Sequence, residues 1–285
     1  QMPTQPGLKL TYATLAAFTK YPRGSAPRRA RGERPVAGLK KHGYHSAEAA
    51  FFAEVAGAVG LLPRPDTLGG GDTIAAWSRH PLAFLVEAAD DICYAILDLE
   101  DGVRLGHVSF ELAQACLRPL APRARDFPAS GDPKEHVGYL RALAINTLIQ
   151  EVCAAFAAHE REILAGALDR PLVKLAPSYP HLEATVRETR ARCYEAKEVL
   201  EVELAGYEVL EFLLDELVGA ALAPTLTPRQ EKLLKLLPHD PRRPDRSTYE
   251  RLLIITDYLS GMTDGYAVTL FRRFKGMALP VWSTR

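Results

Sequence analysis

The stretch "FLVEAADDICYAILDLEDG" (residues 84–102) places six acidic side chains among Ala, Ile, Leu, Val and Cys. At about 100° per residue in an α-helix, Asp90, Tyr94, Asp98 and Asp101 fall within about 80° of one another, with Glu87 beside them. The apolar positions on the opposite side are Leu85, Ala89, Ile92, Ile96 and Leu99. The pattern predicts a helix with a packed back and an acidic stripe.

The acidic stripe has two interpretations. A solvated helix face usually mixes Lys or Arg with Glu, because pairs four residues apart stabilise the helix. Here no cation occurs between Pro81 and Val103. Uncompensated carboxylates on one ridge repel each other unless a cation, or ligand hydroxyls and a bound metal, faces them. Periodicity alone leaves both a solvated face and a ligand-binding face open.

The rest of the chain predicts an all-α fold, since no segment shows convincing strand alternation. Further helices are expected at 10–21, 46–60, 108–119, 135–166, 181–222, 228–237 and 248–275, and the acidic helix is expected to start near Asp72 or Pro81 and to end near Asp101. Prolines and "SGDP" make 120–134 a loop. We therefore expect two parts, 1–119 with the acidic helix and 120–285 as a helical C-terminal subdomain.

Composition narrows the class of protein. The 285 residues carry no net charge, which excludes polyanion binding through bulk charge but not through local patches. Four widely spaced cysteines, each within an apolar helical pattern and without metal-ligand or redox spacing, predict buried free thiols in the reducing cytosol. No signal peptide and no membrane-spanning run is expected.

Four segments carry a resemblance. "EAADDICYAILDLEDG" (87–102) is preceded by "GLKLTYATLAAFTKYP" (7–22) and "KKHGYHSAE" (40–48), and is followed by "YERLLIITDYLSGMTDGYAVTLFRRFKG" (249–276). In this order they resemble bacterial deoxyguanosine triphosphate triphosphohydrolases, a branch of the HD-domain superfamily. The resemblance implies a multi-helix HD-domain-like bundle, a deoxynucleoside triphosphate as substrate, a divalent metal ion (Mg, Mn or Co) as cofactor, and a homo-oligomer, commonly a hexamer.

The resemblance also implies roles for residues. Asp90 matches the last metal ligand, and hard oxygen ligands suit Mg²⁺ or Mn²⁺. Tyr94 and Asp98 match residues that contact the sugar: a flat ring can fill the place of a 2′-hydroxyl, and a carboxylate can accept a hydrogen bond from the 3′-hydroxyl. Without the family, Tyr94 is equally well interpreted as an aromatic residue that fills a gap between helices.

Phosphate binding is implied for two segments. Lys20 and Tyr21 resemble a Lys-Tyr pair that meets the triphosphate, although a Lys at a helix C-terminus also compensates the helix dipole. Lys41 resembles a second phosphate-binding lysine, with Lys40 as the alternative. The arginines of residues 23–34 predict a solvated insertion or, less favoured, an arm that binds single-stranded nucleic acid.

Other features resemble sites but lack their context. His239-Asp240 lies between prolines, where no helix can project both side chains, and "LGGGD" (68–72) lacks the strand and the Lys-Ser/Thr of a phosphate loop. His42 and His45 flank a loop, and His80 is expected to start a helix. None of these is predicted to bind metal.

The chain lacks the family's first His, its His-Asp pair and its assisting His and Glu, which would precede residue 7. We therefore expect a C-terminal part of an enzyme that releases inorganic triphosphate from deoxynucleoside triphosphates, with no catalytic residue of its own and no activity alone. The alternative is a non-catalytic helical module for nucleotide sensing or oligomerisation. The preferred deoxynucleotide and any allosteric activation are not encoded in a recognisable way.

Overall fold

The computed structural model describes residues 8–25, 37–64, 66–67, 73–126 and 132–278, and it divides into two compact units, 1–195 and 196–285. The predicted all-α fold is confirmed. The one sheet within these ranges is an antiparallel pair of two-residue strands, β1 (Asp66–Thr67) and β2 (Thr73–Ile74). Each unit is a helical bundle with its own core.

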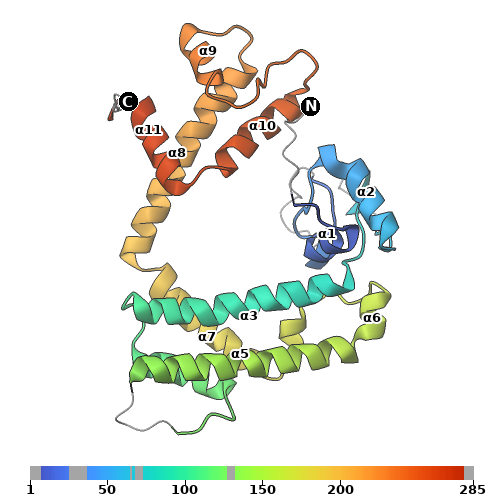
Figure 1. The fold of residues 1–285 in the computed structure, drawn as a ribbon, viewed down its shortest axis with the longest axis vertical. Coiled ribbons are helices and arrows are strands. Elements are labelled where there is room, and N and C mark those ends of the chain that lie inside the picture. Colours follow the sequence, from blue (N-terminus) through green and yellow to red (C-terminus); the bar gives the residue numbers. More distant parts are fainter. Residues whose placement is uncertain (1–7, 26–36, 65, 68–72, 127–131, 279–285) are drawn as a thin grey trace. The chain divides into compact units, whose positions relative to one another are not determined.

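The first unit is built around α3 (Pro81–Arg104) and α5 (Pro133–Ala158), which lie side by side in Figure 1. α4 (Phe110–Leu117) packs against both α3 and α5. α7 (Tyr179–Thr189) packs against α3 and α4. α1 (Tyr12–Phe18) packs on α3 and on α2 (Ala49–Ala58). The core between these helices includes Ile96, Leu99, Leu117, Leu140 and Leu148, all almost fully buried.

The acidic helix α3 starts at Pro81, directly after its N-cap residue His80. His80 is the N-cap, its Nδ1 accepting a hydrogen bond from the backbone N–H of Leu82 at 3.2 Å, and Pro81 occupies the first turn, where its missing N–H costs nothing. The predicted start at Pro81 and the predicted role of His80 are confirmed. Two details of the predicted faces are wrong: Ala89 is exposed, whereas Glu87 is buried.

Three helices that the periodicity predicted as continuous are interrupted. The segment 135–166 divides at His159 into α5 and α6 (Glu160–Leu164). The segment 181–222 contains a π-helical turn, η5 (Arg190–Tyr194), between α7 and α8 (Lys197–Leu222). The apolar spacing continues across both interruptions, so it could not reveal them. The third, in 248–275, lies between α10 (Thr248–Ser260) and α11 (Asp264–Phe274), where Thr263 caps the second helix.

The second unit consists of α8 with α9 (Pro228–Leu234), α10 and α11 packed against it. Leu213, Leu217 and Ile255 are its most deeply buried side chains. Ser247 and Thr227 form capping boxes with Glu250 and Gln230, which satisfy the backbone N–H groups at the starts of α10 and α9. Local sequence signals thus fix the helix starts of this unit.

The predicted boundary between residues 119 and 120 lies inside the first unit. α5 follows the predicted loop but packs against α3 and α4, so it belongs to the same core. The division instead falls between Glu195 and Ala196. A loop rich in proline is therefore a connection within one core here, not a seam.

α5 is, by length and composition, apolar enough to cross a membrane, although the sequence predicted no such run. The same test is passed by central helices of protein cores. Leu140, Ala144 and Leu148 of α5 are fully buried against the other helices of the first unit. This position explains one apolar side of α5, whereas only 28% of its most apolar 18-residue stretch is buried within the described structure.

Candidate nucleotide-binding site along helix α3

The acidic stripe of α3 is compensated by cations and a hydroxyl from other segments. Glu100 accepts a hydrogen bond from Arg141 of α5 at 2.7 Å, and Asp98 accepts one from the hydroxyl of Tyr194. Asp101 pairs with Arg104 at 3.7 Å, on the surface. Apart from Arg104, which is the last residue of α3 itself, these partners come from distant parts of the sequence, so the lack of cations between Pro81 and Val103 does not leave these carboxylates unpaired.

Glu87 is the most strongly paired of these carboxylates. Its Oε2 accepts a hydrogen bond from Nη1 of Arg79 at 2.6 Å, and its Oε1 lies 3.3 Å from Nζ of Lys20. The side chains of Glu87 and Arg79 are almost completely buried, and that of Lys20 is one-third exposed. A buried carboxylate needs such partners, because an unpaired charge away from water is strongly unfavourable.

Lys20, predicted to bind phosphate, is thus placed at α3. Partial burial opposes its charging, but the negative charge of Glu87, with smaller contributions from Tyr21 and Asp91, outweighs this effect and raises the pKa of Lys20. Its ammonium group also lies 5.8 Å from the ring centre of Tyr21. Lys20 therefore remains a cation at neutral pH.

Asp91 lies on the same side of α3 as Glu87, four residues further on. It is half-buried, and burial raises the pKa of its carboxyl, with Lys20 opposing and Glu87 and Asp90 adding to the rise. Lys174, from the segment before α7, also acts on it. The prediction that Asp91 points away from Asp90 agrees with this environment.

Asp90 is exposed, and no hydrogen bond or ion pair of its carboxylate is found among the residues that the structure describes. Beside it runs a row of exposed apolar side chains on α3. Its members are Leu82, Val86, Ala89, Cys93 and Leu97. Asp90 thus lies at the border between an uncovered apolar row and the acidic face.

Cys93, in this row, is exposed, and so is Cys153 of α5. The prediction that the cysteines are buried is therefore wrong for these two.

Tyr94 and Asp98 follow one and two turns beyond Asp90. The ring of Tyr94 is 62% exposed, so it does not fill a gap between helices in this structure. Asp98 accepts the Tyr194 hydroxyl, and this hydrogen bond raises the pKa of Tyr194 to about 12. One oxygen of Asp98 is thereby engaged, and its second oxygen retains capacity to accept a hydrogen bond.

Tyr194 was not among the predicted site residues. It comes from the π-helical turn η5, 96 residues after Asp98 in the chain. η5 packs closely on α3 at Gly102, where a Cβ atom would lie only 2.5 Å from Sγ of Cys193. The absence of a side chain at Gly102 lets η5 approach, and a local π-helix cannot be read from apolar spacing.

The two predicted phosphate-binding segments are joined by their backbones. The N–H of Gly43 donates to the carbonyl of Arg23 at 3.0 Å, and the N–H of Ser25 donates to the carbonyl of Tyr44 at 3.0 Å. A Cβ atom on Gly43 would lie 2.2 Å from the carbonyl oxygen of Tyr21. The structure therefore brings the chain around Lys41 against the chain around Lys20 and Tyr21, with the Lys41 side chain exposed.

An aromatic cluster supports these segments from behind. Tyr44 stacks on Phe52 of α2, with ring centres 4.4 Å apart, and both contact Trp77. The Tyr44 hydroxyl donates to the carbonyl of Ala75 at 2.6 Å, and burial raises its pKa to about 12. Trp77 also donates its backbone N–H to the carbonyl of Pro22 at 2.9 Å. The residues that precede α3 are thereby fixed to the segment that carries Lys20.

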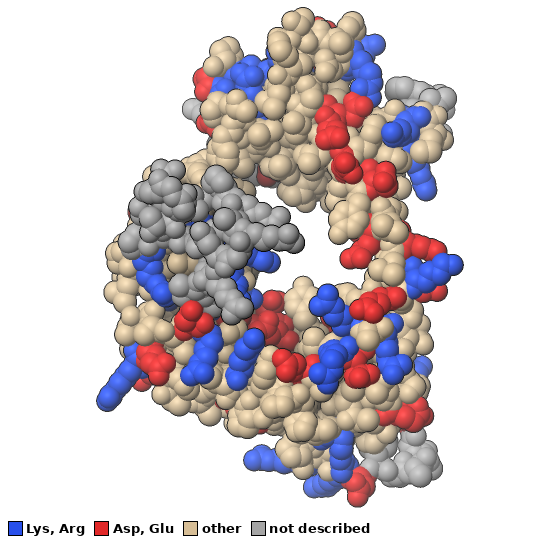
Figure 2. All heavy atoms as spheres, turned by 180° about the vertical axis from the view of Figure 1, so that it is seen from behind, with Lys and Arg blue, Asp and Glu red and all other residues tan. Residues whose placement is uncertain are grey.

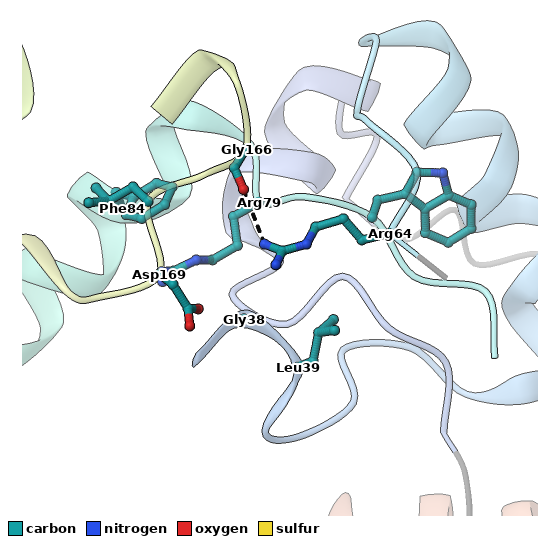
Figure 3. A pocket seen from close by; sticks show the side chains of 9 residues that line it. Gly38, Leu39, Arg64, Arg79, Phe84, Gly166 and Asp169 are labelled. Carbon is teal, nitrogen blue, oxygen red and sulfur yellow. Dashed lines mark hydrogen bonds between the residues drawn. The ribbon is translucent and has the colours of Figure 1, made fainter. Parts of the chain in front are cut away.

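A small cavity of about 10 Å³ lies behind Arg79. Figure 3 shows its lining, which includes Arg64, Phe84, Gly166 and Asp169. The guanidinium carbon of Arg79 lies 3.9 Å from the ring centre of Phe84, and Arg64 donates to the carbonyl of Gly166 at 3.1 Å. This volume has room for about one water molecule, so the cavity is too small for a nucleotide.

The described residues contain no group of three or more His, Cys, Asp or Glu side chains able to hold a metal ion. The described residues therefore do not supply enough ligands to bind a divalent metal ion, and Asp90 offers one carboxylate only. His239 and Asp240 lie in a non-helical turn, as the flanking prolines predicted. His42 and His45 are exposed, with ring centres 5.7 Å apart.

Of the arginines in the predicted loop 23–34, only Arg23 lies within the described residues. Arg23 is buried, so it is neither solvated nor available to a nucleic acid. Arg28, Arg29, Arg31 and Arg34 lie outside the described residues, as does the glycine run 68–72. On the face shown in Figure 2, the basic and acidic side chains are interspersed over the described surface.

Comparison with known proteins supports the resemblance. A protein of Synechocystis sp. named deoxyguanosinetriphosphate triphosphohydrolase-like is 40% identical over 281 residues, which are 98% of this chain and 62% of that protein. A protein of the same name from Pseudomonas aeruginosa is 30% identical over 96% of this chain and 62% of its own length. An Enterobacter sp. protein named deoxyguanosinetriphosphate triphosphohydrolase is 27% identical over 93% and 60%. No family model matches.

This chain is similar over nearly its whole length to proteins named for deoxyguanosinetriphosphate triphosphohydrolase. The similarity extends over nearly all of the chain, including segments 103–245, in which the sequence motifs were least secure. The chain spans about three-fifths of the length of the relatives that it matches. The names of these relatives indicate that the chain is related to hydrolases.

Proposed function

We propose that the chain is the substrate-binding part of an enzyme that hydrolyses deoxynucleoside triphosphates of the dGTP type to a deoxynucleoside and inorganic triphosphate. The observation that carries the proposal is the arrangement along α3. Glu87, Asp90, Asp91, Tyr94 and Asp98 fall within about 100° of the helix. Lys20 lies against the first part of this face, and Tyr94 and Asp98 lie about 10 Å and about 16 Å further along the axis from Glu87.

In this proposal each end of the face has its own task. Lys20 and Lys41, together with Tyr21, bind the triphosphate, whose several negative charges suit mobile lysine ammonium groups. The exposed Tyr94 ring packs against the deoxyribose, and Asp98 accepts a hydrogen bond from the 3′-hydroxyl. Because Tyr194 holds one oxygen of Asp98, the other is oriented toward the sugar.

A metal centre is proposed only for the longer parent protein. Asp90 would supply one ligand, and residues outside this chain would supply the others, with Mg, Mn or Co as candidates. The exposed apolar row of α3 supports this, since a further segment that covers the row would lie directly beside Asp90. A homo-oligomer, with the hexamer implied by the resemblance, and a cytoplasmic location belong to the same proposal.

The experiment compares the chain with its full-length parent. Release of inorganic tripolyphosphate from dGTP is measured for both, with added Mg²⁺, Mn²⁺ or Co²⁺. We expect an active parent and an inactive chain that nevertheless binds tripolyphosphate. Activity of the chain alone would refute the assignment of catalytic groups to the parent. An inactive parent that binds nucleotide would instead favour the non-catalytic sensing or oligomerisation module.

A further inference from the structure

The group formed by Lys20, Glu87 and Arg79 has a feature that the proposed function does not use. Glu87 is a carboxylate 7% exposed, and it faces two cations from outside its helix. Arg79 approaches one oxygen at 2.6 Å, and Lys20 approaches the other at 3.3 Å. Lys20 alone of the three reaches solvent to a substantial degree, with one-third of its side chain exposed.

Arg79 is held rigidly on the inner side of this group. Its guanidinium lies over the Phe84 ring at 3.9 Å, and a Cβ atom on Gly38 would already meet its Cγ at 3.4 Å. Its Nη2 is buried and has no hydrogen-bond partner within the described structure. Arg79 therefore fixes Glu87 from behind and leaves the outer oxygen of the carboxylate for Lys20.

We infer that Glu87 is a positioning residue, which holds the ammonium group of Lys20 at the phosphate end of the α3 face. The inference rests on the proposed role of Lys20 in binding the triphosphate. A free lysine side chain samples many rotamers, and fixing it at the site beforehand removes an entropic cost from binding, which strengthens affinity by about twofold to tenfold. Glu87 itself does not contact the ligand, because it lies beneath Lys20 and is buried.

The group keeps one surplus positive charge, since two cations share one carboxylate. An anion that approaches from outside meets Lys20 first, and Glu87 is screened from it by Lys20 and neutralised by Arg79. Raising the pKa of Lys20 is a second effect of the same contact, because the Glu87 charge favours the protonated amine. The surplus charge favours phosphate binding, whereas the raised pKa adds nothing at neutral pH, because a lysine amine is already protonated there.

The test must separate positioning from simple charge. Glu87→Gln removes one negative charge, which by itself would strengthen the binding of any anion. It also leaves Lys20 without its anchor, which weakens binding. Only the second effect requires Lys20. A double-mutant cycle with Lys20→Ala therefore separates the two effects, because the coupling between the substitutions is a direct measure of their interaction.

Binding of inorganic tripolyphosphate to the 285-residue chain is measured by calorimetry at constant ionic strength for the native chain, Lys20→Ala, Glu87→Gln and the double variant. We expect Lys20→Ala to weaken binding about tenfold, the size of one lost charged hydrogen bond. Glu87→Gln should weaken binding about threefold or more when Lys20 is present. With Lys20→Ala as the background, it should have no effect or a slight strengthening effect.

Glu100→Gln is the matched control. It removes the same charge from the same helix and likewise leaves an arginine, Arg141, without its carboxylate. It lies about 20 Å along α3 from Glu87. Its effect on tripolyphosphate binding should be the same with and without Lys20.

A measurement on the native fold covers the case in which Glu87→Gln fails to fold. Lysines are reductively methylated with ¹³C-formaldehyde, and each dimethylamine is titrated by NMR. The Lys20 signal should titrate at higher pH in the folded chain than in the chain unfolded in urea. Equal titration in the two states would overturn the inference.

The outcomes of the cycle are distinct. Loss of binding in Lys20→Ala with equal effects of Glu87→Gln in both backgrounds overturns the positioning role and leaves the proposed function standing. No loss in Lys20→Ala overturns the phosphate role of Lys20, and the positioning role with it. Loss in both single variants without further loss in the double variant supports the inference.

Discussion

Replacing Gly43 by alanine tests the link between the fold and the candidate site. A Cβ atom at this position would lie 2.2 Å from the carbonyl oxygen of Tyr21 and 2.7 Å from Cγ2 of Thr19. The first contact involves backbone, which no side-chain rotation can relieve. The two segments must therefore separate by about 1 Å to reach ordinary contact distance, and overpacking of this kind costs about 1–3 kcal/mol.

The loss should appear in both stability and binding. Unfolding by urea is followed by fluorescence of Trp77, which lies in the adjacent aromatic cluster, in a Trp282→Phe background that removes the chain's other tryptophan. We expect Gly43→Ala to lower the free energy of unfolding of the first unit by about 2–3 kcal/mol. Tripolyphosphate binding should also weaken, since the Lys20 and Lys41 segments move apart.

Gly57→Ala is the control for this experiment. Gly57 lies within α2, and a Cβ atom there would meet nothing within 4 Å. Alanine should therefore stabilise the protein by about 0.5–1 kcal/mol, because glycine loses more conformational entropy in a helix. If Gly43→Ala were as stable as the native chain, the close contact between the two segments would be refuted.

Three further predictions concern the core, the tyrosines and the thiols. Leu140→Ala, at a fully buried position of α5, should lower the free energy of unfolding in urea by about 2–5 kcal/mol. Leu105→Ala, at a largely exposed position, should lower it little, and equal effects would contradict the placement of α5 in the core. The ultraviolet titration of tyrosine should lose one ionisation near pH 12 in Tyr194→Phe, and Asp98→Asn should return that ionisation toward pH 10. The pKa of Tyr194 is raised in the folded state, so the stabilisation from its hydrogen bond to Asp98 is complete below about pH 10 and is lost as the pH rises through 12. Asp98→Asn should therefore lower the free energy of unfolding at pH 8 and have less effect above pH 12. Exposed Cys93 and Cys153 should react rapidly with a thiol reagent, while Cys116 and Cys193, whose pKa values are raised by burial, should react slowly; four equal rates would contradict this difference.

The sequence predicted those features of the fold that depend on local signals. The start of α3 at His80 and Pro81, the presence of helices near α9 and α10, and the all-α class follow from residues close together in the chain. The breaks at His159 and at η5 were missed because the apolar period passes through them. The place of α5 in the first core was missed because packing partners are not visible in a local pattern.

The candidate site could be predicted in part for the same reason. Lys20 was found through a motif, but its partner Glu87 lies about a third of the first unit away in sequence, so the burial of Glu87 had no local signal. Tyr194 was missed because its neighbour Asp98 is 96 residues away. The roles of Asp90, Tyr94 and Asp98 in binding remain predictions.

The central claim is that the part of the α3 face between Asp90 and Asp98 binds the reacting nucleotide. The most direct test is the rate of tripolyphosphate release from dGTP by the full-length parent carrying Asp90→Ala, with Asp101→Ala, an exposed carboxylate of the same helix, as control. We expect Asp90→Ala to reduce kcat by about a thousandfold, which is about 4 kcal/mol of barrier, and Asp101→Ala to leave kcat unchanged. A parent that keeps its full rate with Asp90→Ala would contradict the claim.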